Sequence, residues 1–60
     1  MKRRELIKRL TSLGATFVHE GGKHTVYRNP STGMLLAVPR HTEIGDGLAQ
    51  RLLRDAARKS

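Results

Sequence analysis

The residues best suited to chemistry are a lysine and a histidine that follow two glycines, in the stretch Gly21-Gly22-Lys23-His24. Glycine leaves the backbone open to a ligand, lysine offers a cation to a phosphate, and histidine exchanges protons near neutral pH. Cleavage of a phosphodiester needs these functions together. The stretch therefore predicts an RNA-cleaving site, although a histidine after such a turn is, taken alone, more often only a hairpin residue.

The charge of the chain favours polyanionic partners. Twelve Lys and Arg residues against five Asp and Glu give a formal net charge of +7 at pH 7. Such an excess predicts salt-sensitive contacts with the phosphates of nucleic acid, and it would also attract an acidic protein. Phe17 and Tyr27 are the only aromatic residues, which disfavours a surface that grips single strands by stacking several bases.

Length and composition predict one small domain over residues 1–60. The chain contains no cysteine, so neither a disulfide framework nor a thiolate metal site is expected. No continuous apolar stretch resembles a signal peptide or a membrane span. The sequence thus predicts a cytoplasmic protein with no membrane partner.

Apolar residues recur at helical spacing near the start of the chain and predict an amphipathic helix of about three turns. They are Leu6, Ile7, Leu10 and Leu13, and basic residues fill most of the positions between them. Gly14 is suited to the left-handed conformation that ends a helix, so the helix is expected to stop there. Its basic face is expected to be solvated, with phosphate contacts only where it adjoins the site.

Three strands are predicted between this helix and a second one. Residues 15–20 and 23–28 form a hairpin across the two glycines, and residues 34–38 follow a dense turn signal. The continuous apolar sequence of the third strand predicts a position in the centre of the sheet or under both helices. Asp46 is expected to cap the second helix, which carries one apolar stripe.

The order α-β-β-β-α predicts an α+β fold in which two helices cover one face of a three-stranded antiparallel sheet. Strand alternation places His24, Val26 and Arg28 on one side and Thr25 and Tyr27 on the other. If Tyr27 joins the core, His24 and Arg28 face solvent together. In the opposite register Val26 points inward and His24 is a buried strand residue.

Several motifs in this order resemble the HicA family, toxins of bacterial and archaeal toxin–antitoxin pairs. They are Gly22-Lys23-His24 followed by Tyr27, then Val38-Pro39-Arg40-His41, then Glu43-Ile44 and a leucine-rich last helix. The resemblance spans nearly the whole chain. It implies a fold similar to a double-stranded RNA-binding domain, ribosome-independent endoribonuclease activity on mRNA, and a cognate antitoxin, HicB, that covers the active site.

The resemblance also assigns the site. The family's catalytic histidine falls on His24, preceded by Gly22 of a Gly-Ser-His signature in which Lys23 replaces the usual serine. His19 stands where the family often has an arginine, so the phosphate contact inferred from that arginine does not carry over.

The chemistry assigns roles independently of the family. A nuclease that uses the 2′-hydroxyl of RNA needs a proton acceptor, a cation for the phosphorane and a proton donor for the leaving oxygen. His24 is the expected proton-transfer residue, with Lys23 and Arg28 as phosphate stabilisers. His41 is either the second acid or base or a solvated loop residue. RNA contacts are expected from Gly22, Lys23, Arg28, Arg40 and His41.

No cofactor is predicted. His19, His24 and His41 lack the spacing of a zinc site, and no carboxylate cluster completes a set. Glu20 and Glu43 are instead expected to be solvated partners of basic neighbours.

The sequence therefore predicts a metal-independent endoribonuclease toxin that cleaves mRNA, inhibits translation and growth, and is neutralised by a HicB-type antitoxin. DNA is expected as a partner only through an antitoxin complex, if at all. A DNA-binding half of a regulator is a more distant interpretation, because no helix-turn-helix links the two helices. The alternative is a non-catalytic double-stranded RNA-binding module. Such modules carry lysines at the start of the last helix, where this chain has Gly47, Leu48, Ala49 and Gln50.

Overall fold

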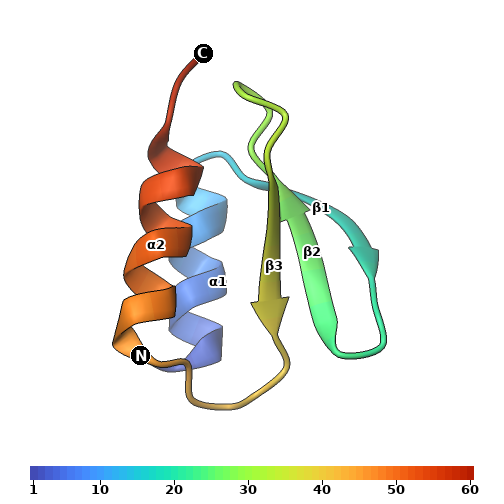
Figure 1. Cartoon of the computed structure of the whole chain (residues 1–60), viewed down its shortest axis with the longest axis vertical. Helices are drawn as coiled ribbons and strands as arrows, with labels where there is room; N and C mark the ends of the chain where they lie inside the picture. The colour runs from blue at the N-terminus through green and yellow to red at the C-terminus, as the bar shows by residue number, and fades with distance from the viewer.

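A computed structural model describes residues 1–60, and its elements follow the predicted order (Figure 1). The helices are α1 (Arg3–Ser12) and α2 (Asp46–Ala57), and the strands are β1 (Thr16–Glu20), β2 (His24–Arg28) and β3 (Leu35–Pro39). The strands form one antiparallel sheet in the order β1-β2-β3, and the two helices pack side by side against one of its faces. This arrangement confirms the predicted α+β fold.

Gly14 ends α1 as the sequence predicts. Its φ of +100° is left-handed, and its N–H donates to Thr11 O at 3.0 Å while the Ala15 N–H donates to Leu10 O at 3.0 Å. These two bonds satisfy carbonyls that the end of a helix would otherwise leave free. The chain can therefore turn directly from α1 into β1.

The inward residues of β2 and β3 meet the helices in a single core. Its buried apolar members are Leu6, Leu10, Ala15, Leu36, Val38, Ile44, Ala49, Leu52 and Ala56. On β2, Thr25 is buried and Tyr27 packs against this core, whereas His24 and Arg28 are exposed. The register in which Tyr27 points inward is thus confirmed, and it turns His24 away from the helices.

Of the two positions predicted for the third strand, the centre of the sheet is wrong, because β2 occupies it and β3 is an edge strand. The other position, under the helices, is confirmed, because β3 contributes to the core that both helices share. Leu36 and Val38 are buried in the core, but Leu35 on the opposite side is 61% exposed. The continuous apolar run concealed this alternation because the helices cover only one face of the sheet.

Asp46 does not cap α2, which corrects a second prediction. Gly45 is the N-cap residue and makes no side-chain cap hydrogen bond, and Asp46 is the first residue of the helix. Its Oδ1 lies 3.5 Å from the Met1 ammonium group, which also lies 3.2 Å from Glu43 Oε2. The Asp46 carboxylate therefore has the N-terminal ammonium group as its partner and makes no cap contact with a backbone N–H of α2.

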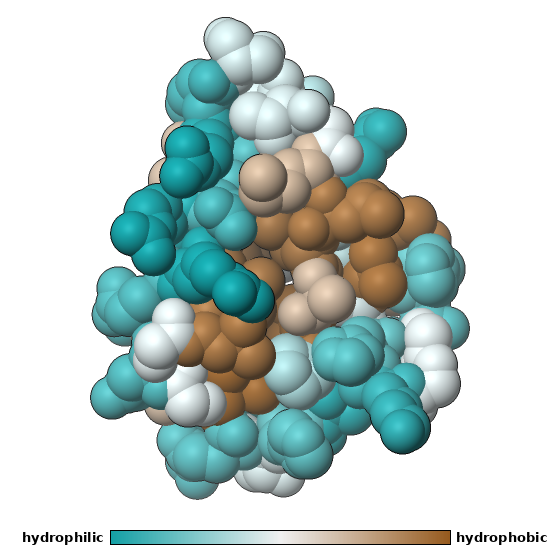
Figure 2. Space-filling view, in the orientation of Figure 1, coloured by the Kyte–Doolittle hydropathy of each residue, from teal (hydrophilic) through white to brown (hydrophobic).

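Hydrophobic side chains are also exposed on the surface, notably over the strands. Phe17, Val18, Met34 and Leu35 are each more than two-fifths exposed. In Figure 2, brown side chains gather over the middle of the molecule, while its lower end is mostly teal and white. The structure contains no helix with the length and apolar character needed to span a membrane.

Candidate functional site

A cavity of about 310 Å³ lies between the β1–β2 turn and the segment that follows β3. Its lining residues are Gly22, Lys23, His24, Pro39, Arg40 and His41. We call it the histidine cavity. The antiparallel register explains its composition, since His24 pairs with Pro39 and the residues just before His24 therefore lie at the same end of the sheet as the residues just after Pro39. Both segments lie at the lower end of the molecule in Figure 1.

His24 opens β2 and is held by the geometry of the hairpin turn. The Gly21 N–H donates to the His24 carbonyl at 2.8 Å, and a Cβ at Gly21 would lie only 2.9 Å from that oxygen. A Cβ at Gly22 would meet no atom within 4 Å. Gly21 is therefore the residue that shapes the turn, and Gly22 is an open part of the cavity wall.

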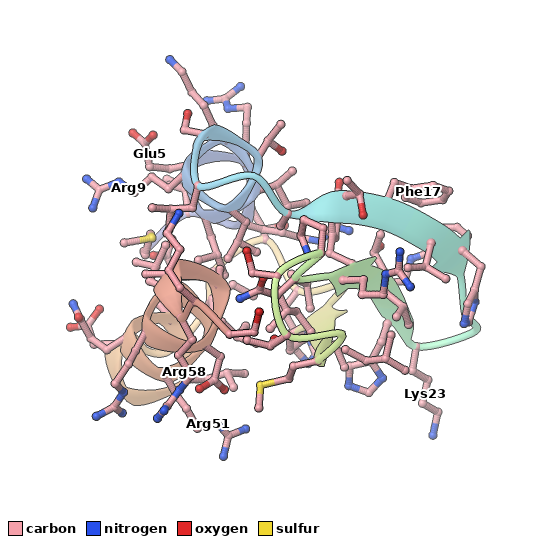
Figure 3. All side chains as sticks on the ribbon, turned by 90° about the horizontal axis from the view of Figure 1, so that it is seen from above. Glu5, Arg9, Phe17, Lys23, Arg51 and Arg58 are labelled. Carbon is pink, nitrogen blue, oxygen red and sulfur yellow. The ribbon has the colours of Figure 1, made fainter.

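Lys23 is exposed at the tip of the turn. Its side chain extends away from the body of the molecule (Figure 3). Because it makes no salt bridge, its ammonium group is available to an anion that approaches the histidine cavity.

Arg40 joins the far wall of the cavity to the hairpin. Its Nη2 lies 2.6 Å from Glu20 Oε2 and its Nη1 donates to Gly21 O at 3.3 Å. About half of each side chain in this ion pair is exposed, so the guanidinium remains accessible to a ligand. The expectation that Glu20 partners a basic residue is confirmed.

Arg3 supports the site from behind and was not identified from the sequence. Its Nε donates to Pro39 O at 2.9 Å, and its Nη2 donates to the hydroxyl of Thr25, a buried residue adjacent to His24. A threonine at an inward strand position requires such a donor or acceptor. That requirement was the available signal, but it does not specify which residue supplies the partner.

Two residues considered from the sequence lie outside the cavity. Arg28 is at the other end of β2, about 13 Å from His24 at the usual rise per strand residue. His19 lies opposite Val26 on β1 and does not line the cavity. The structure thus groups Gly22, Lys23 and His24 with Arg40 and His41, and it leaves Arg28 apart from them.

The structure contains no group of three or more His, Cys, Asp or Glu side chains that could hold a metal ion. The ionisable side chains of the cavity are instead one lysine, one arginine and two histidines. Two proton-exchanging groups beside two cations constitute the side-chain set for acid–base chemistry at a phosphate.

Comparison with known proteins gives one result. Residues 3–57 match the family model described as the HicA toxin of bacterial toxin–antitoxin systems. No curated protein and no solved structure matches the chain significantly. Since the match covers both helices and all three strands, the chain belongs to the HicA toxin family of bacterial toxin–antitoxin systems.

Proposed function

We propose that this toxin is an endoribonuclease that cleaves mRNA without a metal ion and that His24 is its catalytic histidine. The observation that carries the proposal is the histidine cavity, in which His24 lies on an open sheet face with Lys23, Arg40 and His41 on the same walls. Membership of the HicA family supports the same activity.

The reaction uses the 2′-hydroxyl of the substrate as nucleophile. His24 accepts the proton of this hydroxyl while O2′ forms a bond to phosphorus and the bond from phosphorus to O5′ breaks. The leaving O5′ takes a proton from His41 or from water. The products are a 2′,3′-cyclic phosphate and a 5′-hydroxyl, so protons and bonds balance.

Lys23 and Arg40 supply the positive charge that this step needs. The phosphate carries more negative charge on its equatorial oxygens in the transition state than in the ground state, and cations aimed at those oxygens lower the barrier. Arg40 has a fixed position through Glu20 and Gly21, whereas Lys23 is free to follow the substrate.

The decisive experiment compares His24→Ala with His19→Ala on one labelled transcript. Both variants remove an exposed histidine from the sheet, but only His24 lines the cavity. We expect His24→Ala to lose cleavage by a factor of about 100 or more, and His19→Ala to cleave like the parent. Circular dichroism verifies that both are folded. Equal cleavage rates in the two variants would refute the role of His24.

Two further measurements test the reaction type. A 2′-O-methyl group at the scissile nucleotide is expected to block cleavage, because it removes the nucleophile. Cleavage is expected to continue in excess EDTA; loss of activity that magnesium or zinc restores would show a metal-dependent mechanism.

We further propose that a HicB-type antitoxin neutralises the toxin by covering the histidine cavity. Family membership implies an antitoxin partner, and an exposed cavity whose four ionisable lining residues are all basic would be closed by an acidic segment. Growth arrest on expression of the toxin alone, relieved by co-expression of the adjacent antitoxin frame, tests this.

Double-stranded RNA binding without cleavage is less well supported. The first residues of α2 are Asp46, Gly47 and Leu48, which offer no cation to the backbone of a duplex. A preference for uncleaved duplex over single-stranded RNA would favour this alternative.

A further inference from the structure

A second cavity adjoins the histidine cavity and is strongly basic. It has a volume of about 400 Å³ and is lined by Lys2, Arg3, Arg4, Arg40 and Thr42. We call it the basic groove. Arg40 belongs to both cavities, so one guanidinium stands at the junction between them. The start of α1, the segment after β3 and the hairpin turn follow one another along the lower end of the molecule in Figure 1.

The groove continues along the first turns of α1. A third cavity of about 240 Å³ is lined by Lys2, Arg4, Glu5 and Lys8, and it shares Lys2 and Arg4 with the groove. Arg4 and Lys8 are four residues apart and therefore lie on the same side of the helix. The basic face of α1 thus adjoins the site, which is the condition for a functional role of that face.

The acidic residues nearby neutralise only part of this charge. Lys2 Nζ lies 3.6 Å from Glu43 Oε1 and Arg40 is paired with Glu20, while Arg3 is hydrogen-bonded only to neutral groups. Glu5 is the one acidic residue on the walls of the third cavity. Arg4 and Lys8 form no salt bridge, so their charges are uncompensated.

We infer that the basic groove binds the phosphates of the RNA strand on one side of the scissile nucleotide and guides that strand from the histidine cavity along α1. This inference rests on the proposed nuclease function and adds to it a binding path for the flanking nucleotides. Arg40 contacts the phosphate nearest to His24, and Arg4 and then Lys8 contact phosphates farther along the strand.

The lining of the groove favours RNA over an acidic protein. None of the residues that line the groove or the third cavity is hydrophobic. Protein interfaces have an apolar centre that is depleted in charge, whereas nucleic-acid interfaces are polar and strongly positive. The exposed apolar residues Phe17, Val18 and Leu35 lie on the strands and do not line the groove.

The test is a binding experiment that does not depend on cleavage. Single-stranded RNA with 2′-O-methyl ribose throughout is titrated with protein by fluorescence anisotropy, at lengths of about 4 and about 12 nucleotides, over a range of salt concentrations. The test variant is Arg4→Ala/Lys8→Ala. The matched control is Arg51→Ala/Arg54→Ala, which removes the same charge from exposed positions of α2 that line neither the cavity nor the groove. Alanine favours the helix in both variants.

We expect the test variant to bind the longer RNA about tenfold more weakly. Its salt slope, which is the steepness with which log affinity falls with log salt concentration, should decrease by about 1.4, the value for two lost phosphate contacts on a single strand. Its affinity for the shorter RNA should match that of the control. Equal affinities of the two variants for the longer RNA would refute the proposal that the basic groove binds the flanking phosphates. An equal loss of affinity for the shorter and the longer RNA would refute it too. A failure of His24→Ala to reduce cleavage would instead refute the nuclease site, and it would not affect the binding measurement on the basic groove.

Discussion

Arg40 Nη2 lies 2.6 Å from Glu20 Oε2, so the cation shared by the histidine cavity and the basic groove is held by an acid of strand β1. Glu20 fixes the guanidinium in place but also cancels part of its charge. In the RNA complex that we propose, the phosphate and Glu20 therefore compete for Arg40. An exposed ion pair of this kind is weak enough for a phosphate to replace it.

We expect Glu20→Gln to bind RNA about 1.4- to fivefold more tightly, because the exposed pair that the phosphate must replace is worth about 0.2 to 1 kcal/mol. Asp55→Asn is the control, since it also frees an arginine, Arg58, but at the C-terminal end of α2. Anisotropy with uncleavable RNA measures both. Weaker binding by Glu20→Gln would mean that placement of Arg40 matters more than its free charge.

The two glycines of the turn are expected to differ when replaced. Gly21→Ala should destabilise the protein, because its Cβ would lie 2.9 Å from the backbone oxygen of His24. Gly22→Ala should change the free energy of unfolding by less than about 0.5 kcal/mol, since its Cβ meets open space. Urea titrations measure both values.

The same Gly22→Ala variant tests the contact with RNA. If substrate packs against the turn, the added methyl group lowers cleavage at unchanged stability. Cleavage at the rate of the parent would show that Gly22 is not part of the binding surface.

The sequence predicted the elements well because each has a strong local signal. The apolar spacing of α1, the left-handed Gly14 and the two glycines of the hairpin are all short-range features. The position of β3 at the sheet edge was not predictable in this way, because it depends on which strands pair and not on the residues of the strand itself. The exposure of Leu35 was not predictable either, because Leu35 and Leu36 are chemically alike and only the placement of the helices buries one and exposes the other.

The candidate site was predicted where it is local and missed where it depends on tertiary contacts. The residues around His24 and those around Arg40 were found as two motifs, and the register of β2 and β3 brings them together. Arg3 belongs to the basic face of α1, which was predicted to be solvated. Nothing in the local sequence indicates its hydrogen bonds to Thr25 and Pro39. Arg28 carried no signal that distinguished it from the cationic residues that do line the cavity.

Asn29 is another tertiary feature that sequence reasoning treated only as a turn residue. It is 2% exposed, and its Nδ2 lies 2.8 Å from Asp55 O and 2.9 Å from Arg58 O at the end of α2. Asn29→Ala leaves these carbonyls without that donor and should lower the free energy of unfolding by about 2 to 3 kcal/mol. Thermal unfolding measures the loss. Thr32→Ala, at an exposed position of the same turn, should have a small effect, and a similar loss in both variants would contradict this role.

The contact between Met1 and Glu43 predicts a pH-dependent term in stability. The hydrogen bond between them raises the pKa of the Met1 ammonium above its usual 8.0 and lowers the pKa of Glu43 below its usual 4.5. The contact stabilises the folded protein fully between pH 4.5 and pH 8.0, the usual pKa values of the two groups. It is lost as the pH falls through the lowered pKa of Glu43, and also as the pH rises through the raised pKa of the ammonium group.

Urea unfolding of the parent and of Glu43→Gln from about pH 3 to pH 10 tests this term. The difference between the two proteins should be largest in the middle of the range and decline on both sides. A difference that stays constant across the range would show that this contact does not contribute a pH-dependent stability.

The effect of Lys23 on the proposed reaction can be separated from that of the histidine. The Lys23 side chain extends away from the molecule (Figure 3), and its charge is screened by salt within about 10 Å. Lys23→Ser should therefore weaken RNA binding and lower the salt slope by about 0.7, with the pH optimum of cleavage unchanged. Lys59→Ser, which removes an exposed lysine near the C-terminus, is the charge-matched control. A pH–rate profile with one substrate decides the matter: an optimum displaced upward by about one unit at unchanged affinity would show that Lys23 acts on the catalytic base instead of on the substrate.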